Sequence, residues 1–234
     1  MCIRDRDNGY ALYVPRLFKH VHTSVCADQR RALEVSDIGN LLCETEKAAT
    51  CGSLPIELQT TKNIFALMFL LRGIPFVDLA YLRKADIQGN TLRYRRRKTG
   101  RLLTVMLTPD AMKLIRIVAK TKPESPYLFP FLSSPEGTEA AYHEYQSSLR
   151  VFNYRLSRLK KYIKTAAHLS SYTIRHTWAT MAYYCEIHPG IISEAMGHSS
   201  IKVTETYLKP FQNEKIDNAN SQVISYVKEY ASIV

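Results

Sequence analysis

The sequence lacks the patterns that mark a secreted, membrane or metal-binding protein. Its five cysteines include no C-x-x-C pair, which argues against a zinc site or a disulfide framework and is typical of a reducing cytoplasm. No apolar run approaches the roughly 20 residues of a membrane-spanning helix. The N-terminus has no secretory signal either. We therefore expect a cytoplasmic protein with no metal site and no membrane-spanning segment.

Acidic residues are scarce relative to basic ones. Lys and Arg total 32 against 21 Asp and Glu, which gives a formal net charge of +11. Such an excess favours an anionic partner, either nucleic acid or an anionic membrane surface. The alternative is a basic protein that merely stays soluble, and composition alone leaves both open.

The 234 residues suit one large domain or two small ones. Residues 1–6 have no periodicity and no link to the rest of the chain, so we interpret them as a sequencing-adapter scar or a disordered leader. Residues 7–28 form a short Pro-containing stretch that resembles the end of a longer unit. We expect residues 29–220 to form the main domain and residues 221–234 a C-terminal amphipathic helix, with these apolar positions: Val223, Ile224, Val227, Tyr230 and Ile233.

Hydrophobic periodicity predicts a mostly helical fold with one small sheet. Residues 86–107 contain two turn signals, Gly89-Asn90 and Thr99-Gly100, and β-favouring residues lie between and after them, which predicts two or three antiparallel strands. Ser36 is a candidate helix cap, and Gly73 ends a helix. The expected fold class is therefore α+β, mostly α with a small antiparallel β-sheet. Helices are predicted over residues 31–42, 60–71, 76–83, 109–119, 140–167, 172–185, 189–196 and 222–233.

Positive charge is concentrated in two of these elements. Lys and Arg bind phosphates without reading sequence. For the predicted hairpin we favour phosphate contact, because like charges this close repel one another unless an anion is present. For the helix, a solvated charged face is an equal alternative. The hairpin carries Arg93, Arg95, Arg96, Arg97, Lys98 and Arg101, and the helix over residues 140–167 carries Arg155, Arg158, Lys160 and Lys161.

Two segments contain the residues best suited to chemistry. The first is Tyr172-Thr-Ile-Arg-His-Thr-Trp-Ala-Thr180, and the second runs from Gly197-His198 to Tyr207, nine residues after the histidine. The first resembles the H-x-x-R-H-T-x-A-T box of the tyrosine recombinases, the phage-integrase family. The second resembles their L-G-H box with its downstream tyrosine. The resemblance covers roughly residues 29–220.

The resemblance implies an enzyme that cleaves and rejoins double-stranded DNA through a 3′-phosphotyrosyl intermediate, without a metal or other cofactor, as a homotetramer on paired sites. Several segments, such as Tyr94-Arg-Arg-Arg-Lys-Thr-Gly100, resemble integrases of Bacteroidetes mobile elements. In that branch a helical core-binding domain precedes the catalytic domain. We expect residues 7–28 to be the remainder of that domain, in a shortened bacterial protein.

The chemistry of the matched residues suits strand cleavage without metal, which needs a nucleophile, stabilisation of the phosphate charge and an acid for the leaving 5′-oxygen. Tyr207 is the expected nucleophile, because a phosphotyrosyl bond conserves the energy of the broken linkage. Arg175 offers bidentate donors to phosphate, and His198 can orient or donate to the same oxygens. The resemblance assigns the general-acid role to Lys98, although its basic neighbours are alternatives.

These residues also have structural alternatives. Taken alone, a tyrosine is usually structural, and only its box points to a nucleophile. Arg175 could instead pair with Glu194, and His198 could end a helix. We expect the remaining aromatic residues of the boxes and their surroundings to pack or to cap helices: His168, His176, His188 and Trp178.

Two positions depart from the family pattern. Tyr172 stands where the H-x-x-R motif begins with histidine; its hydroxyl can donate to a phosphate oxygen but carries no charge at pH 7. Pro75 stands where most of the family has an arginine, three residues before the acid, which is here Asp78.

Two arginines are candidates to replace the one missing at position 75. Arg72 lies about a helical turn upstream of the expected site. Arg96 lies two residues before Lys98, so on a strand both side chains would project from the same face. We favour Arg96.

Two other functions stay open. One is a catalytically impaired DNA-binding remnant, and the other is a topoisomerase IB-like enzyme that relaxes DNA by similar chemistry. For the C-terminal helix, packing on its own core and docking on a neighbouring protomer are equal alternatives.

Overall fold

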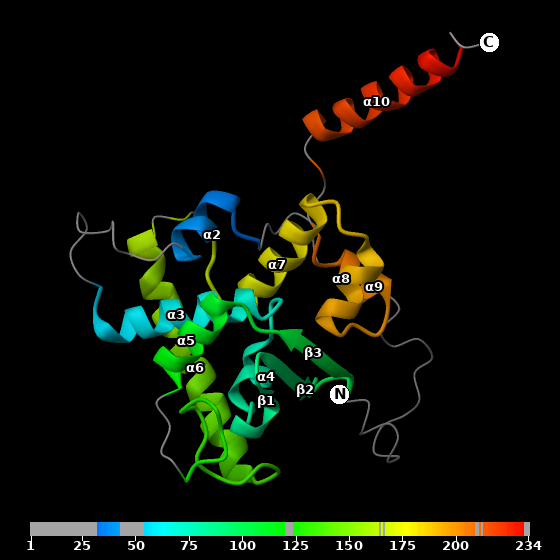
Figure 1. Cartoon of the computed structure of the whole chain (residues 1–234). Coiled ribbons are helices and arrows are strands. Elements are labelled where there is room, and N and C mark those ends of the chain that lie inside the picture. Colours follow the sequence, from blue (N-terminus) through cyan, green and yellow to red (C-terminus); the bar gives the residue numbers. More distant parts are fainter. Residues whose placement is uncertain are drawn as a thin grey trace, which may run out of the picture.

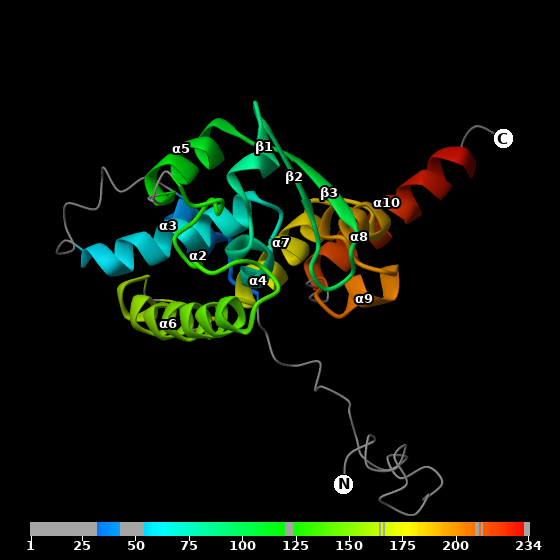
Figure 2. The same ribbon diagram turned by 90° about the horizontal axis from the view of Figure 1, so that it is seen from below.

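The most apolar segment of the chain forms the central helix of the fold. Helix α3 (Ile56–Leu70) buries residues around most of its circumference, including Phe65 and Leu67. Such a helix is stable inside a core, and each of these two side chains contributes about 1.5–3 kcal/mol by leaving water. Three helices pack around it, as Figures 1 and 2 show: α5 (Pro109–Val118), α6 (Glu139–Ile163) and α7 (Thr173–Tyr184).

The structure is a computed structural model that describes residues 32–42, 54–119, 124–163, 165, 167–208, 211 and 213–231. The expectations for residues 1–28 and for the side chains of Tyr230 and Ile233 lie outside this part of the chain. The remaining helices are α2 (Val35–Leu42), α4 (Phe76–Ala80), the 3-10 helix η1 (Lys84–Asp86), α8 (Pro189–Met196), α9 (Ile201–Glu205) and α10 (Asn213–Ala231).

The sheet has three antiparallel strands in the order β1-β2-β3: β1 (Ile87–Gln88), β2 (Thr91–Arg95) and β3 (Leu102–Met106). Leu92 and Tyr94 face the core, whereas Arg93 and Arg95 alternate onto the exposed face. The β2–β3 turn is closed where the Gly100 N–H donates to the Arg96 carbonyl at 2.7 Å. The predicted α+β class and its small sheet are confirmed.

The first helices differ from the prediction at their ends. Ser36 is not a cap, because α2 begins at Val35 and includes it. Helix α3 begins directly after Pro55, earlier than residue 60, since proline is well accommodated just before a helix. Helix α4 ends at Ala80 rather than at residue 83, because Arg83 is extended and forms a β-bridge with Tyr127.

The later helices also differ at their ends. Helix α6 ends at Ile163 rather than at residue 167, and α10 begins at Asn213 rather than at residue 222. The short helix α9 was not predicted, because five residues show too little of a helical repeat. His188 caps α8 as expected, since its ring accepts the N–H of Gly190.

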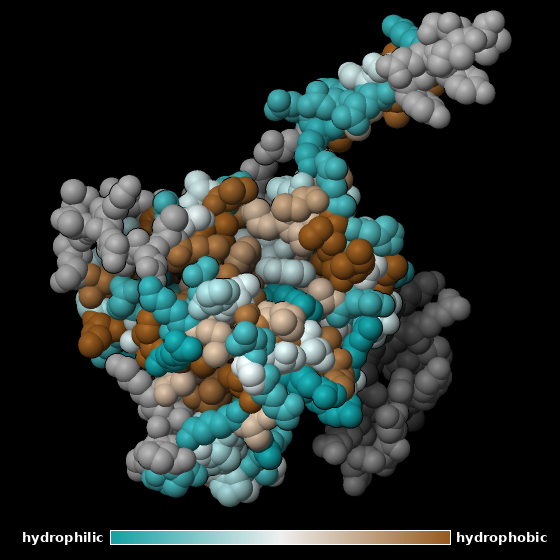
Figure 3. All heavy atoms as spheres, in the orientation of Figure 1, coloured by the Kyte–Doolittle hydropathy of each residue, from teal (hydrophilic) through white to brown (hydrophobic). Residues whose placement is uncertain are grey.

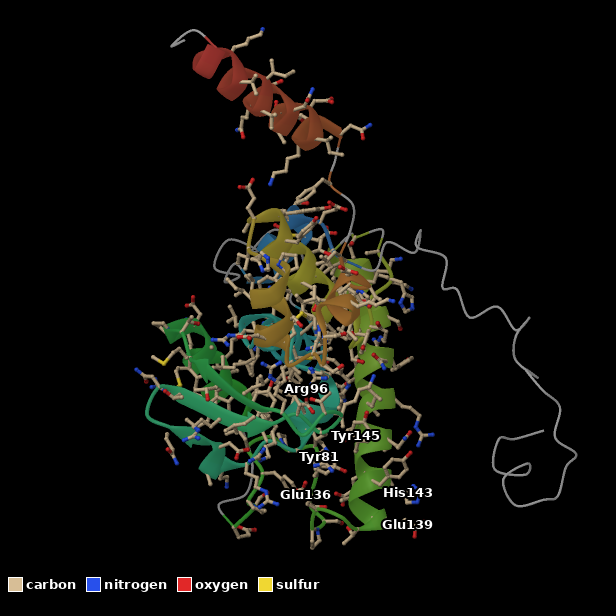
Figure 4. The ribbon with its side chains drawn as sticks, turned by 90° about the vertical axis from the view of Figure 1, so that its right-hand side faces the viewer. Tyr81, Arg96, Glu136, Glu139, His143 and Tyr145 are labelled. Atoms are coloured by element: carbon tan, nitrogen blue, oxygen red, sulfur yellow. The ribbon has the colours of Figure 1, made fainter. Side chains whose placement is uncertain are left out.

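Helix α10 stands clear of the body in Figures 1 and 4. Its first turn contacts the end of α7, because the ammonium group of Lys215 donates to the Tyr184 carbonyl at 2.7 Å. Farther along, Val223, Ile224 and Val227 are exposed. In Figure 3, apolar surface (brown) is visible next to polar surface (teal) along the described part of the helix. The described apolar side chains of α10 therefore do not pack on the core of their own chain.

Gly73 lets the end of α3 approach α7 closely. Its φ is +66°, and a Cβ atom there would lie 3.0 Å from the Arg175 Cα atom and 3.2 Å from the Trp178 Cβ atom. Arg72 also has a positive φ, of 60°. The chain therefore reverses direction through two left-handed residues, and this reversal brings the Gly73 carbonyl next to α7.

We predict that Gly73→Ala destabilises the protein more than Gly89→Ala does. Gly89 also has a left-handed φ, of +59°, but a Cβ atom there would have nothing within 4 Å. Gly89→Ala should cost about 1 kcal/mol of backbone strain, and Gly73→Ala should cost about 1–3 kcal/mol more through the added steric conflict. Urea unfolding of the two variants measures the difference, and equal losses would contradict the close approach.

Candidate active site

Arg175 is held inside the molecule by backbone carbonyls. It lies on α7 and is only 2% exposed. Its guanidinium donates to the Gly73 carbonyl at 2.9 Å, to the Met196 carbonyl at 2.7 Å and to the His198 Nε2 atom at 2.8 Å. Its Nε atom is buried without a hydrogen-bond partner in the described structure. The alternative of a pair with Glu194 is wrong, because that carboxylate is exposed and lies 3.9 Å from Arg101 instead.

Arg96 joins Arg175 at the same carbonyl. It is buried, its Nε atom lies 2.8 Å from the Asp78 Oδ2 atom, and its Nη1 atom donates to the Met196 carbonyl. The other carboxylate oxygen of Asp78 accepts the N–H of Arg97 at 2.9 Å. Burial raises the pKa of Asp78, and the Arg97 N–H and the arginine charges oppose that rise. Asp78 therefore orients both the side chain of Arg96 and the backbone that follows it.

The two guanidinium groups leave an excess of positive charge inside the site. Burial lowers the pKa of Arg175, and the charge of Arg96 lowers it further. Asp78 supplies one negative charge against the two arginines. The carbonyl end of α8 offsets part of the remainder, since it is the negative end of the helix dipole. A buried pocket with this balance favours an anion.

His198 is neutral and has a defined tautomer. Burial, followed by the charges of Arg175, Arg96 and Lys98, lowers its pKa to about 3. Its Nε2 atom accepts from Arg175, which has only donors, so the proton must be on Nδ1, which lies 2.8 Å from the Thr204 hydroxyl. The backbone N–H of His198 also closes the end of α8 by donating to the Ser193 carbonyl. His198 therefore has both the structural role and the site position that the sequence suggested.

Tyr207 lies directly beside these residues. Its ring stacks on His198 with centroids 4.9 Å apart and lies against His176, tilted by 34°, with centroids 4.6 Å apart. The guanidinium carbon of Arg175 lies 5.6 Å from the ring centroid. The Thr180 hydroxyl, on α7, donates to the Tyr207 carbonyl at 3.1 Å. The expected nucleophile therefore lies against the candidate site residues of its own chain.

Tyr172 lies at the exposed side of the site. It is the residue just before α7 and is 44% exposed. Its hydroxyl lies 2.5 Å from the Tyr207 hydroxyl. Burial, together with the hydrogen bond to Tyr207, raises the pKa of Tyr172 to about 12. Its hydroxyl therefore keeps its proton at neutral pH.

Lys98 lies in the β2–β3 turn, on the surface. The expectation that Arg96 and Lys98 share a strand face is wrong, because strand β2 ends at Arg95. In the turn that follows, the Arg96 side chain is buried and the Lys98 side chain is exposed. The charge of Lys98 still contributes to the low pKa of His198. Arg101 ties the turn to the site, because its guanidinium donates to the His198 carbonyl at 3.0 Å.

Arg97 is engaged away from the pocket. Its guanidinium stacks over the Tyr81 ring, with 3.7 Å to the centroid, and forms an ion pair with Glu136. Glu136 also pairs with Arg83. In Figure 4, Tyr81 and Glu136 lie toward the end of the molecule where α6 begins at Glu139.

Arg72, the other candidate to replace the missing arginine, reaches the sheet. Its guanidinium donates to the Thr104 carbonyl in β3 at 3.3 Å. In contrast, Arg96 lies close enough to Arg175 and His198 to lower the pKa of both. The geometry therefore groups Arg96, and not Arg72, with the other site residues.

The remaining basic candidates lie on the surface. Arg93 and Arg95 are exposed on the outer face of the sheet, and Arg158 and Lys161 are exposed on α6. Arg155 is partly buried and lies 3.6 Å from Glu57. Lys160 is partly buried as well.

Sequence reasoning missed the groups that hold the site together. The carbonyls of Gly73 and Met196 are backbone atoms, which no side-chain pattern reveals. Thr204 lies within the second box, and its hydroxyl binds the Nδ1 atom of His198. It was missed because it takes no direct part in the expected reaction. Within the described part of the chain, no group of three or more His, Cys, Asp or Glu is arranged to hold a metal ion. The helices described there include none that is long and apolar enough to span a membrane.

We predict that Asp78→Asn lowers the free energy of unfolding by about 3 kcal/mol or more. The amide would place an NH₂ group against either the Arg97 N–H or the Arg96 Nε atom, which are both donors. It would also remove the negative charge that balances Arg96. Glu136→Gln is the matched control, since it also weakens two arginine contacts but at the surface, and should cost about 1 kcal/mol or less. Urea unfolding compares the two variants. Similar losses would contradict the central role of Asp78.

Three solved structures illustrate what the fold resembles. The XerA recombinase is 16% identical with a TM-score of 0.55, covering 82% of this chain and 64% of that one. The XerH site-specific recombinase bound to a palindromic difH substrate is 15% identical with a TM-score of 0.58, covering 82% and 52%. The Tn1549 transposon integrase in complex with circular intermediate DNA is 16% identical with a TM-score of 0.56, covering 94% and 74%. At these identities the likeness shows the fold.

The chain spans 64% and 52% of the length of the first two of these structures. No curated protein matches the chain. The sequence model of the Phage integrase family matches residues 40–214, which include each of the candidate catalytic residues. The chain therefore belongs to the phage integrase family of tyrosine recombinases.

Proposed function

We propose that the chain is the catalytic domain of a recombinase that cleaves and rejoins double-stranded DNA through a 3′-phosphotyrosyl intermediate. The observation that supports this most is the convergence of two buried arginines and a neutral histidine beside the Tyr207 ring. Such an arrangement suits an anionic phosphodiester, whose negative charge grows during attack.

The reaction begins when the Tyr207 oxygen attacks phosphorus. A bond forms between that oxygen and phosphorus, and the bond from phosphorus to the 5′-oxygen breaks. Arg175 and Arg96 stabilise the non-bridging oxygens. His198 holds Arg175 in place through its Nε2 atom. The phenol proton of Tyr207 is released to solvent water, and Lys98 donates a proton to the leaving 5′-oxygen. Rejoining follows the same steps in reverse.

The exposed basic residues form the DNA contact surface of this proposal. Arg93, Arg158 and Lys161 are exposed and free to contact phosphates. Arg95 is exposed as well, and its guanidinium donates to the Gly100 carbonyl at 3.1 Å, a contact that it would exchange for phosphate. Arg97, Arg101, Arg155 and Lys160 bind DNA after exchanging their present contacts. The turn that carries Lys98 brings this surface to the active site.

The proposed assembly is a homotetramer on paired DNA sites in a bacterial cytoplasm. The exposed apolar residues of α10 support it, because they are suited to docking on a neighbouring protomer. We further propose that residues 29–220 are the catalytic domain, that residues 7–28 derive from a preceding core-binding domain, and that residues 1–6 are a leader or scar. The resemblance to integrases of Bacteroidetes mobile elements supports an origin in such an element.

Covalent trapping tests the central claim. Nicked suicide duplexes with randomised sequence around the nick should yield SDS-resistant protein–DNA adducts, and mass spectrometry should map them to Tyr207. Tyr207→Phe should abolish the adducts. Gel-shifted DNA without any adduct would favour a DNA-binding remnant, and relaxation of supercoiled plasmid without site preference would favour a topoisomerase IB-like enzyme. Adducts that map elsewhere would refute the assigned nucleophile.

Two arginine variants test which residue replaces the one missing at Pro75. Arg96→Ala should slow adduct formation by about 100-fold or more, since one charge-stabilising donor is typically worth that much. Arg72→Ala should change the rate only a few-fold, because its guanidinium bonds to β3. Single-turnover kinetics on a selected duplex measure both. If neither variant loses activity, Arg96 does not compensate for Pro75.

A further inference from the structure

The hydroxyl of Tyr172 pairs with the hydroxyl of the expected nucleophile, Tyr207. The two tyrosine oxygens lie 2.5 Å apart, and the two rings are 5.9 Å apart and tilted by 35°. The family pattern places a histidine at this position, and the proposed reaction makes no use of the phenol that replaces it. The contact therefore needs its own explanation.

The start of α7 places this phenol. Tyr172 precedes the helix and makes no side-chain cap hydrogen bond, so its hydroxyl has no capping role. Its ring meets His176 edge-on with centroids 5.5 Å apart, and His176 in turn contacts the Tyr207 ring at a tilt of 34°. Tyr172 also lies three residues before Arg175, about one helical turn, so both project toward the same side.

Helix α7 consequently holds Tyr207 at two points. The Thr180 hydroxyl binds the Tyr207 carbonyl, and Tyr172 meets the hydroxyl at the other end of the residue. Between these points His198 stacks on the ring and His176 contacts it at a tilt. The last of these contacts, at the reacting oxygen, is the one that chemistry can use.

We propose that Tyr172 is a positioning residue that donates its hydroxyl proton in a hydrogen bond to the Tyr207 oxygen, and thereby holds the nucleophile beside Arg175. The inference rests on the proposed function. It also assigns Tyr172 a different partner from the phosphate oxygen that the sequence suggested.

The direction of donation follows from the charge that develops on the Tyr207 oxygen. While both hydroxyls carry protons, either can donate. Once Tyr207 loses its proton, its oxygen can only accept, and Tyr172 keeps its own proton because burial and the contact with Tyr207 raise its pKa to about 12. A hydrogen bond to an ionised acceptor is roughly twice as strong as one between neutral groups. The bond therefore strengthens as charge develops on the Tyr207 oxygen, during attack in cleavage and during departure in rejoining.

Fluorine NMR tests the contact without DNA. The full chain is prepared with Tyr207→3-fluorotyrosine, alone or together with Tyr172→Phe, which removes one oxygen and keeps the ring. The ¹⁹F resonance should shift and broaden in the double variant as the Tyr207 ring loses its anchor. Tyr154→Phe is the matched control, since Tyr154 is 63% exposed on α6, and should leave the resonance unchanged. An unchanged resonance with Tyr172→Phe would overturn the proposal.

Single-turnover kinetics then test the consequence on the selected suicide duplex. Tyr172→Phe should form adduct about 10- to 100-fold more slowly, as a misplaced reacting group does, while DNA affinity stays the same. A matching loss of affinity would show that Tyr172 binds DNA instead and would overturn the proposal. An adduct on Tyr172 in Tyr207→Phe would also overturn it, by revealing a second nucleophile. If the unaltered chain forms no adduct, the proposed function fails, and the fluorine spectra still decide whether the contact exists.

Discussion

The structure depends on one backbone oxygen, the carbonyl of Met196, which accepts from both buried arginines. Two like charges this close repel each other, so each needs a further partner. Asp78 supplies one for Arg96, and the Gly73 carbonyl supplies one for Arg175. The end of α8, the β2–β3 turn, α4 and the start of α7 therefore meet at a single point, where excess positive charge is buried and an anion is favoured.

The convergence requires close approach of the backbone at two glycines. Gly73 lies against α7, and Gly197 ends α8 with a φ of +65°, where a Cβ atom would lie 3.0 Å from the Arg96 Cγ atom. The left-handed turn at Gly197 also directs His198 back toward Arg175. Both positions therefore suit glycine, because the backbone is left-handed there and a Cβ atom would lie too close to neighbouring atoms.

The site departs from the family pattern without losing its charge. Pro75 removes an arginine, yet Arg96 occupies the buried position beside Arg175 and is oriented by Asp78. Tyr172 replaces a histidine, and its hydroxyl faces the Tyr207 oxygen. Both replacements keep hydrogen-bond donors near the expected nucleophile. Tyr172 does so from the position of the histidine, whereas Arg96 comes from a different part of the chain than Pro75.

The amino-acid sequence by itself determined the α+β class, the small antiparallel sheet of two or three strands and most helices, because periodicity and turn residues act locally. Its two boxes also indicated Tyr207, Arg175 and His198, which lie together in the fold. Only the tertiary structure places Arg96 beside Arg175 and Arg72 against β3, since that arrangement depends on which guanidinium the turn buries. It alone revealed the Met196 carbonyl, the pairing of the Tyr172 and Tyr207 hydroxyls and the apolar face that α10 leaves uncovered. Each of these joins groups far apart in the sequence, and neither residue type nor spacing encodes a contact between distant segments.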